Sequence, residues 1–233
     1  RVNSPLDNAT NYFVAKSHMD RAEDLSVRKD GMGEAIQTVK SANEGIKAIT
    51  DLIASAKGIA QSALSAGTTE RATLATQFGN IRTQIDRLAE DSGYKGTNLL
   101  DSGTLQVKFN EDGSSTLSIT GFDASTSGLS ISAAAGSWET DTNINAAITN
   151  LDNALTTLRS QSKTLSSNLN IITTRNSFTQ GMINVLTEGA TNLTAADTNE
   201  EGANMLMLQV RQSLGTTALS LSAQAAQSVL RLF

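Results

Sequence analysis

The stretch NINAAITNLDNALTTLRSQSKTLSSNLNIITTRNSFTQGMINVLT, residues 143–187, decides the fold of this chain. Its apolar residues recur at alternating steps of four and three, and they are Ile144, Ile148, Leu151, Leu155, Leu158, Leu165, Leu169, Ile172, Ile183 and Leu186. Ser162, Asn176 and Thr179 fill the remaining positions of the series. A period of 3.5 residues held for about six heptads predicts a helix that winds left-handedly on partner helices. Such a helix would be roughly 65 Å long, so it needs equally long neighbours.

The residues before this stretch predict three of those neighbours. A first helix is expected to end near Lys29, because Asp30-Gly31-Met32-Gly33 predicts a break. A second helix then runs to Gly67, and its apolar stripe narrows from isoleucine to alanine. A third helix, capped by Thr68 or Thr69, stops at Asp91-Ser92-Gly93. The fold class is therefore mainly α, a long antiparallel helical rod of the coiled-coil type.

Between the third helix and the long helix, the periodicity changes from that of a helix to that of a strand. Two short segments that alternate apolar and polar residues flank the turn signal at residues 110–113, which predicts a β-hairpin. The hairpin residues that we single out are Val107, Phe109, Leu117 and Ile119. Leu129 and Ile131 suggest a short third strand, and the small polar residues from Ala124 to Ser137 predict an exposed loop.

The last helix is expected over residues 195–233, after a second break at Glu188-Gly189. Beyond Glu201 its only charged residues are Arg211 and Arg231. Its apolar stripe is Met207, Val210, Leu214, Ala218, Leu221, Ala225, Val229 and Leu232. Leaving such a stripe in water is costly, at roughly 25 cal/mol per Å² of apolar area. The sequence therefore predicts that this helix binds partner helices.

The composition argues against catalysis and against several kinds of ligand. The chain has no cysteine and a formal net charge of −5, so neither a thiolate metal site nor a nucleic-acid surface is expected. The single histidine, His18, lies among charged helical residues, where a plain surface side chain is the expected role. Phosphate-binding loops, nucleophile motifs and metal-ligand spacings are absent from the sequence. No cofactor, no metal, no enzyme activity and no membrane-spanning helix are predicted.

Three separated segments resemble bacterial flagellins. Residues 1–9, RVNSPLDNA, are similar to the segment that follows the first helix of the family. IDR at residues 85–87, followed by YKGTNLL at 94–100, resembles the end of the amino-terminal rod helix and its loop. QAAQSVLRLF at 224–233 resembles the family's carboxy terminus. The likeness covers nearly the whole chain outside residues 101–140.

The resemblance implies a domain order and a location. Residues 1–32 would form a proximal spoke or linker helix, 33–189 a helical rod with a β-hairpin region at about 101–140, and 190–233 a helix of the filament's inner tube. The short middle segment implies a flagellin without large outer domains. A terminal helix expected before Arg1 is missing from the sequence. The implied protein is secreted and extracellular, a structural subunit that polymerises into the flagellar filament for motility.

The resemblance also implies partners. These are further copies of the chain, an export chaperone, and the filament cap and hook-junction proteins. The hook–filament junction adaptor shares the architecture and stays open as an alternative function. An enzyme in the variable region is a third reading, although residues 101–140 are too short to house one.

Two further expectations rest on the resemblance. In the family a hairpin region is implicated in switching between subunit packings. This resemblance implies a switch near Val107, Phe109, Leu117 and Ile119, unless the four residues simply cap the rod's core. Many flagellins bind a Toll-like receptor through an arginine and a glutamate on the rod. The aligned positions here are Ser55 and Gln77, so weak or absent receptor activation is expected.

Overall fold

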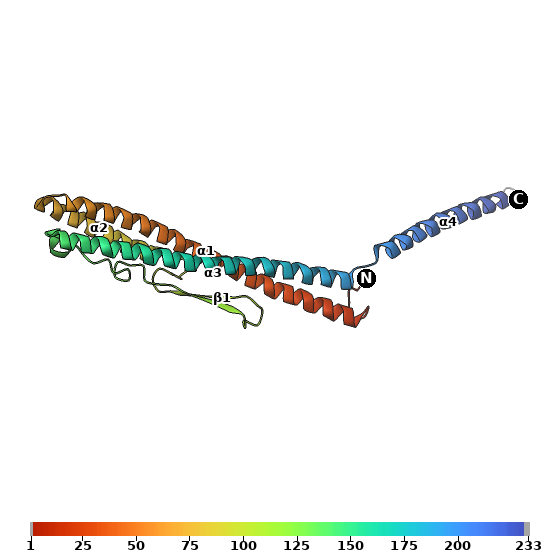
Figure 1. The fold of residues 1–233 in the computed structure, drawn as a ribbon. Helices are drawn as coiled ribbons and strands as arrows, with labels where there is room; N and C mark the ends of the chain where they lie inside the picture. The colour runs from red at the N-terminus through yellow and green to blue at the C-terminus, as the bar shows by residue number, and fades with distance from the viewer. Residues whose placement is uncertain (1, 231–233) are drawn as a thin grey trace. The chain divides into compact units, whose positions relative to one another are not determined.

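The fold, taken from a computed structural model that describes residues 2–230, consists of four long helices and one β-hairpin (Figure 1). The helices are α1 (Ala9–Leu64), α2 (Thr68–Asp91), α3 (Asp141–Thr194) and α4 (Thr198–Leu230). The strands are β1 (Thr104–Lys108) and β2 (Thr116–Thr120), and a short turn of helix, η1 (Ala135–Trp138), precedes α3. The chain divides into two compact units, residues 21–184 and residues 1–20 with 185–233.

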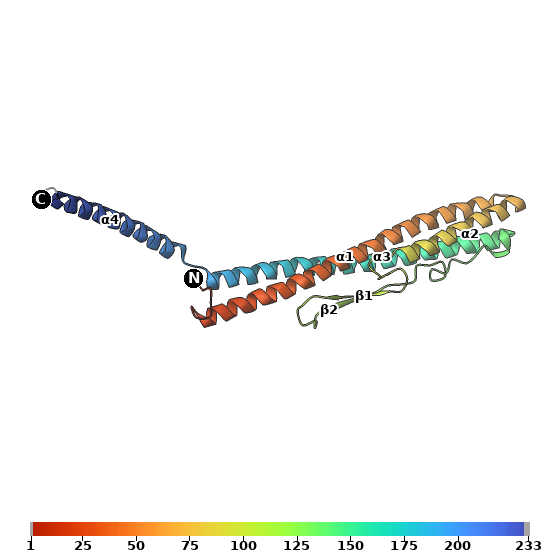
Figure 2. The same ribbon diagram turned by 180° about the vertical axis from the view of Figure 1, so that it is seen from behind.

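In the larger unit, α1, α2 and α3 lie side by side (Figures 1 and 2). Polar contacts fix α1 and α3 as antiparallel. The Lys29 ammonium donates to Gln180, Ser162 donates to Asn43, and Lys57 pairs with Asp152, so positions rise along α1 as they fall along α3. This is the long helical rod predicted from the period of 3.5 residues.

The heptad series of α3 forms the buried stripe. Ile144, Leu151, Leu158 and Ile172 are fully buried, and Thr179 is 3% exposed although it is polar. The other members of the series are buried or half-buried as well. The polar positions therefore face the core as the spacing predicted, and the series itself is confirmed.

α1 is continuous through residues 30–33, so the predicted break there is wrong. A glycine costs roughly 1 kcal/mol in a helix interior relative to alanine. The core offsets this cost, because a seven-residue series passes through the site without a step. Its members are Leu25, Met32, Val39, Ile46, Ile53 and Ala60, and all are buried. Local turn residues favour a break at residues 30–33, but the longer buried series keeps the helix continuous.

The predicted break at Glu188-Gly189 is wrong for a similar reason, since α3 continues to Thr194. Leu186 and Ala190, on either side of Gly189, are both buried. The chain leaves the helix only at residues 195–197, so α4 begins at Thr198 rather than at 195. α2 has the expected bounds, but its N-cap is Gly67, and neither Thr68 nor Thr69 caps it.

The turn between α1 and α2 is held by one side chain. The guanidinium of Arg71 donates to the carbonyl oxygens of Leu64 (3.2 Å) and Ala66 (3.0 Å) at the end of α1. It also pairs with Asp141 at the start of α3, at 2.6 Å, and donates to the carbonyl of Glu139. One cation thus joins the ends of three helices.

The β-hairpin is the predicted one, with Val107 opposite Leu117 and Leu105 opposite Ile119 in an antiparallel register. Within residues 2–230 the sheet has these two strands only, so the suggested third strand is wrong. Leu129 and Ile131 are nevertheless buried, because the segment is tied to α2. Arg82 donates to the carbonyl of Ile131, and Asp86 accepts from the backbone and the hydroxyl of Thr126. Eight of the 14 residues from Ala124 to Ser137 are exposed as predicted, whereas Ala124, Thr126, Leu129 and Ile131 are buried and form a packed cover.

Trp138 follows this segment and belongs to the same hydrophobic core as Leu129 and Ile131. Its side chain is fully buried and contacts Phe78 of α2, with ring centroids 4.9 Å apart. Its φ of 64° lies in the left-handed region, as do those of Gly136 and Ser137. A left-handed residue with a side chain costs about 1–2 kcal/mol, and burial of the large indole offsets that cost.

Candidate assembly surfaces

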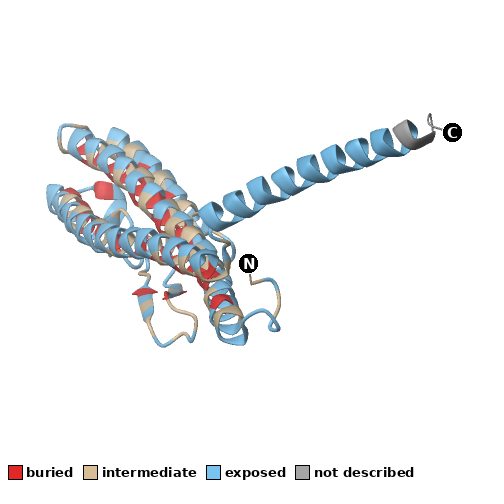
Figure 3. Cartoon of the chain, turned by 90° about the vertical axis from the view of Figure 1, so that its right-hand side faces the viewer, coloured by how far each residue is buried: buried red, intermediate tan, exposed pale blue. Residues whose placement is uncertain are grey.

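α4 is the largest apolar surface that the chain leaves open. Every described side chain from residue 198 to 227 is exposed, and Figure 3 shows the helix without a buried face. Eight large apolar side chains of α4 are between 51% and 73% exposed. They are Met205, Leu206, Met207, Leu208, Val210, Leu214, Leu219 and Leu221.

The predicted stripe is only part of this surface. Met207, Val210, Leu214, Ala218, Leu221 and Ala225 lie on α4 and are exposed, while the Val229 side chain and Leu232 lie outside the described residues. Four further residues of the exposed apolar surface, Met205, Leu206, Leu208 and Leu219, lie outside the stripe predicted from the sequence. Because successive helical residues turn by about 100°, the four apolar residues 205–208 surround the helix. A helix that is apolar all round is suited to burial on several sides.

The first turn of α4 is stabilised by carboxylates. Asp197 accepts hydrogen bonds from the backbone of Asn199 (2.9 Å) and Glu200 (3.4 Å), which caps the helix. Glu200 and Glu201 lie in the first turn, where negative charge complements the helix dipole. From there to residue 227 the only charged side chain is Arg211. The apolar part of α4 therefore follows a capped first turn that carries two carboxylates.

The predicted hairpin residues lie against the rod. Val107 and Ile119 are 3% and 1% exposed and belong to the core, and Leu117 is half-buried against it. Phe109, 7% exposed, lies under the guanidinium of Arg175 of α3, whose central carbon is 5.2 Å from the ring centroid. The four predicted residues therefore attach the hairpin to the rod.

The hairpin turn is bound to α1 by charge. The Arg21 Nε lies 2.6 Å from the Glu111 carboxylate, and Arg28 donates to the Glu111 carbonyl at 3.2 Å. Within the turn, the backbone of Ser114 donates to Asp112 and lowers the pKa of that carboxyl. Between the turn and the helices is a cavity of about 250 Å³, lined among others by Leu25, Phe178 and Met182. These contacts were not visible in the sequence, because they join residues far apart in the chain.

The two positions aligned with a receptor contact are both accessible. Ser55 lies on α1 and Gln77 on α2, and both are exposed. Both belong to the larger unit. Each of these two side chains is neutral.

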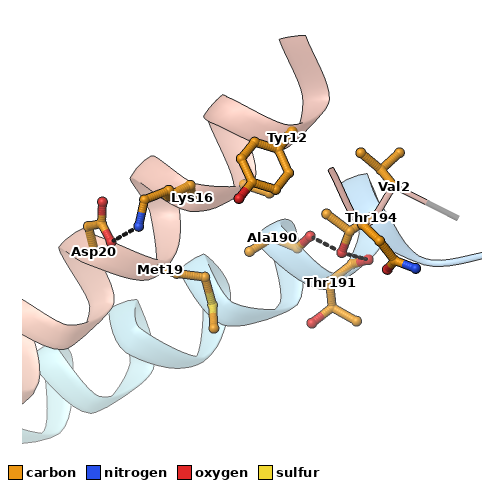
Figure 4. A pocket seen from close by; sticks show the side chains of 10 residues that line it. Val2, Tyr12, Lys16, Met19, Asp20, Ala190, Thr191 and Thr194 are labelled. Carbon is orange, nitrogen blue, oxygen red and sulfur yellow. Dashed lines mark hydrogen bonds and ion pairs between the residues drawn. The ribbon is translucent and has the colours of Figure 1, made fainter. Parts of the chain in front are cut away.

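The smaller unit contains a separate cavity of about 420 Å³ (Figure 4). Val2, whose amide donates to the Thr194 carbonyl at 3.1 Å, lines it together with Tyr12 and Met19. Lys16 and Asp20 pair at its edge at 3.3 Å.

Neither a metal-binding cluster nor a membrane-spanning helix is found in the described part of the chain. Among residues 2–230 no group of three or more histidine, cysteine or acidic side chains is placed to hold a metal ion. In the same part of the chain no helix has the length and apolar character needed to cross a membrane. Among the described residues, α4 carries eight of the sixteen exposed large apolar side chains, and buried residues attach the hairpin to the rod.

Several known proteins are similar in sequence to this chain. The family described as the bacterial flagellin N-terminal helical region matches residues 1–104. Flagellin FljM of Caulobacter vibrioides is 29% identical over 237 residues, covering all of this chain and 86% of its own length. A flagellin of Brucella melitensis is 29% identical over 245 residues, with 87% of its length covered.

A solved structure supports the fold independently. The crystal structure of Bacillus cereus flagellin superposes with a TM-score of 0.54 over 72% of this chain and 95% of that chain, at 18% identity. The family match, the full-length similarity and the helical rod agree with the three segments singled out in the sequence. The chain is therefore similar to bacterial flagellins along its whole length, and about 40 residues, 101–140, separate its helical halves.

Proposed function

We propose that this chain is a structural subunit that polymerises into the extracellular bacterial flagellar filament and so serves motility. The observation that carries the proposal is α4, whose described side chains are all exposed although eight of them are large and apolar. Burial of such a helix between copies recovers roughly 25 cal/mol per Å² of apolar area removed from water. An inner tube built from many copies of α4 would bury it on several sides at once.

The test replaces two large apolar residues of α4 by aspartate. Leu214→Asp together with Leu221→Asp would place carboxylates where packing excludes water, so we expect polymerisation of the secreted chain to be lost. The rod should keep its helicity and its Trp138 fluorescence, because neither leucine is buried in the single chain. Normal filaments from this double variant would overturn the assignment of α4 to the assembly.

A matched control shows whether the loss of polymerisation depends on where the two charges are placed or only on their number. Thr76 and Thr83 are exposed on α2 and are also seven residues apart. Thr76→Asp with Thr83→Asp adds the same two charges outside α4, and we expect filaments of normal length. Electron microscopy of the secreted chain measures both variants.

The alternative function is that of a hook–filament junction adaptor, which has the same architecture. An adaptor joins two structures and does not form a bulk polymer. Long tubes grown from the chain alone would favour the filament subunit, whereas the absence of tubes would favour the adaptor. The similarity to named flagellins supports the first function.

We also place a packing switch at the hairpin, within the same function. The support is the contact of Val107 and Ile119 with the rod's core and of Phe109 with Arg175. The alternative is that these residues only cap the core. Truncation by Phe109→Ala should change the filament waveform across pH and salt if the hairpin is the switch. An unchanged waveform would favour the cap.

The proposed partners follow from the surfaces. An export chaperone would cover α4 before secretion, and the cap and hook-junction proteins would contact the ends of the polymer. Neutral Ser55 and Gln77 support weak or absent activation of the Toll-like receptor by the free chain. A structural role needs no catalytic residue and no cofactor.

A further inference from the structure

α3 carries a second apolar series, which points away from the core of its own chain. Ile171 is 42% exposed and Phe178, seven residues later, is 59% exposed. The residues that follow each of them, Ile172 and Thr179, are buried in the core stripe. Arg175 lies between the two exposed residues at the four-three spacing of a heptad. We name Ile171, Arg175 and Phe178 the α3 outer stripe.

The surface around this stripe is hollowed on both sides. A cavity of about 330 Å³ lies against Ile171 and Arg175. The cavity of about 250 Å³ beneath the hairpin turn is lined by Arg175 and Phe178. Exposed apolar residues beside hollows of side-chain size are typical of a surface that accepts the side chains of another helix.

The charge on this part of α3 has one sign. Between Asp152 and Glu188 its ionisable residues are Arg159, Lys163 and Arg175, and the segment has no carboxylate. A partner helix that packs here is therefore expected to carry acidic side chains near its apolar residues.

α1 offers such a surface in the same unit. Val27 is 62% exposed, and Glu23, Asp24 and Asp30 are exposed around it. We name these four residues the α1 acidic face. None of its three carboxylates forms an ion pair within the described part of the chain. The neighbouring cations Arg21, Arg28 and Lys29 are instead bound to Glu111 and Gln180 of their own chain.

We propose that the α1 acidic face of one copy packs on the α3 outer stripe of a second copy, an inference that rests on the proposed filament function. The two surfaces lie at the same level of the rod, because Lys29 of α1 contacts Gln180 of α3 at 2.8 Å. Neighbouring copies can therefore meet side by side with little axial offset. Two different surfaces in contact form a heterologous interface, which repeats without closing and suits a helical polymer.

Cysteine pairing tests the contact, since the chain has no cysteine of its own. One preparation carries Val27→Cys and the other Phe178→Cys, and filaments are grown from an equal mixture and oxidised. A disulfide between them joins two chains, because each chain has only one thiol. We expect a crosslinked dimer from the mixture, and from neither variant alone, as a disulfide requires Cα atoms within about 7 Å.

The matched control is Thr173→Cys in place of Phe178→Cys. Thr173 is exposed on the same helix but lies about 140° around its axis from residue 178. Crosslinking of the 27–178 mixture above that of the 27–173 mixture supports the interface. Equal or lower crosslinking overturns it.

Charge reversal gives a second readout. Arg175→Glu would place a carboxylate against the α1 acidic face of the neighbour, and we expect the critical concentration for assembly to rise roughly fivefold. Adding Asp24→Lys in the same chain should restore assembly. If the critical concentration is still raised after Asp24→Lys is added to Arg175→Glu, the proposed pairing is wrong.

The failures of the two proposals can be told apart. Filaments that form normally without a 27–178 crosslink overturn this interface and leave the filament function intact. Crosslinks that form in a chain unable to make filaments support the interface and overturn the filament function.

Discussion

The guanidinium of Arg175 covers the ring of Phe109 at 5.2 Å, and this contact joins α3 to the end of strand β1. Phe109 is nearly buried, whereas Arg175 is exposed on its outer side. One face of the arginine thus holds the hairpin, and the other is available to a neighbour.

A double-mutant cycle should measure this contact. Phe109→Leu keeps an apolar side chain, and Arg175→Gln keeps a long polar one, so each removes the cation–aromatic attraction with little change in volume. We expect a coupling free energy of about 0.5–1 kcal/mol in urea unfolding followed by Trp138 fluorescence. Additive effects of the two substitutions would show that the contact does not stabilise the hairpin.

Two glycines of α1 should respond in opposite directions to alanine. A Cβ at Gly45 would lie 2.6 Å from the Leu100 Cδ1, so we expect Gly45→Ala to destabilise the rod by about 1–3 kcal/mol. Gly58 has no atom within 4 Å of the equivalent position. Gly58→Ala should stabilise by up to about 1 kcal/mol through helix propensity. Equal effects of the two substitutions on the urea midpoint would contradict the close packing at Gly45.

The continuity of α1 through residues 30–33 can be tested in the same way. Gly31 has open space around its Cβ position, so Gly31→Ala should raise stability by about 0.5–1 kcal/mol if the residue is helical. A residue at a helix break that needs positive φ would respond with a loss of stability. Urea unfolding distinguishes a helical residue 31 from a helix break, and destabilisation by Gly31→Ala would indicate a break at residues 30–33.

The ion pair between Glu34 and Lys95 makes stability depend on pH. The Lys95 ammonium, and then the Tyr94 hydroxyl, lower the pKa of Glu34 from its ordinary 4.5, while Glu34 raises the pKa of Lys95 above 10.5. The contribution of Glu34 is therefore present above pH 4.5 and is lost as pH falls through its lowered pKa. That of Lys95 is present below pH 10.5 and is lost as pH rises through its raised pKa.

Glu34→Gln should thus destabilise at neutral pH and have little effect in strong acid. The measurement is the difference in urea midpoint between the two chains at pH 7 and below about pH 3. Both side chains are exposed, so added salt should reduce the difference at pH 7. A difference that is the same at both pH values would exclude the ion pair as its cause.

Restoring two charges should increase receptor binding. Loss of a charged contact commonly costs about 2 kcal/mol or more, which is roughly thirtyfold in affinity. We therefore expect weak signalling by the free chain through the Toll-like receptor and stronger signalling after Ser55→Arg with Gln77→Glu. Potent activation by the unchanged chain in a receptor-reporter assay would overturn this expectation.

Long-range periodicity predicted the rod better than local turn residues did. The series through Leu151 and Leu158 gave the buried face of α3, because a heptad repeat is a property of the whole helix. Gly31 and Gly189 were assigned to breaks because their local preference opposes a helix. Buried neighbours such as Met32 and Ala190 outweigh that preference, and Met32 belongs to the buried seven-residue series of α1.

The contacts of the middle segment could not be predicted from its composition. Small polar residues from Ala124 to Ser137 have no clear period, so an exposed loop was expected. In the structure, Asp86 and Arg82 bind the backbone and hydroxyl groups of this segment. Such pairs join residues forty or more positions apart, and a single sequence does not show which polar residues meet.

Arg71 also has a consequence for the order of folding. The turn between α1 and α2 is short, so these helices can pair as soon as both have been formed, at a small cost in loop-closure entropy. α3 pairs with α1 over separations of about 95 to 151 residues, which is a slower search. Arg71 reaches Asp141 only when α3 arrives. We therefore expect Arg71 to give α3 its first contact with a helical hairpin that α1 and α2 have already formed. The pairing of α3 with these helices would then extend from that contact along the rod.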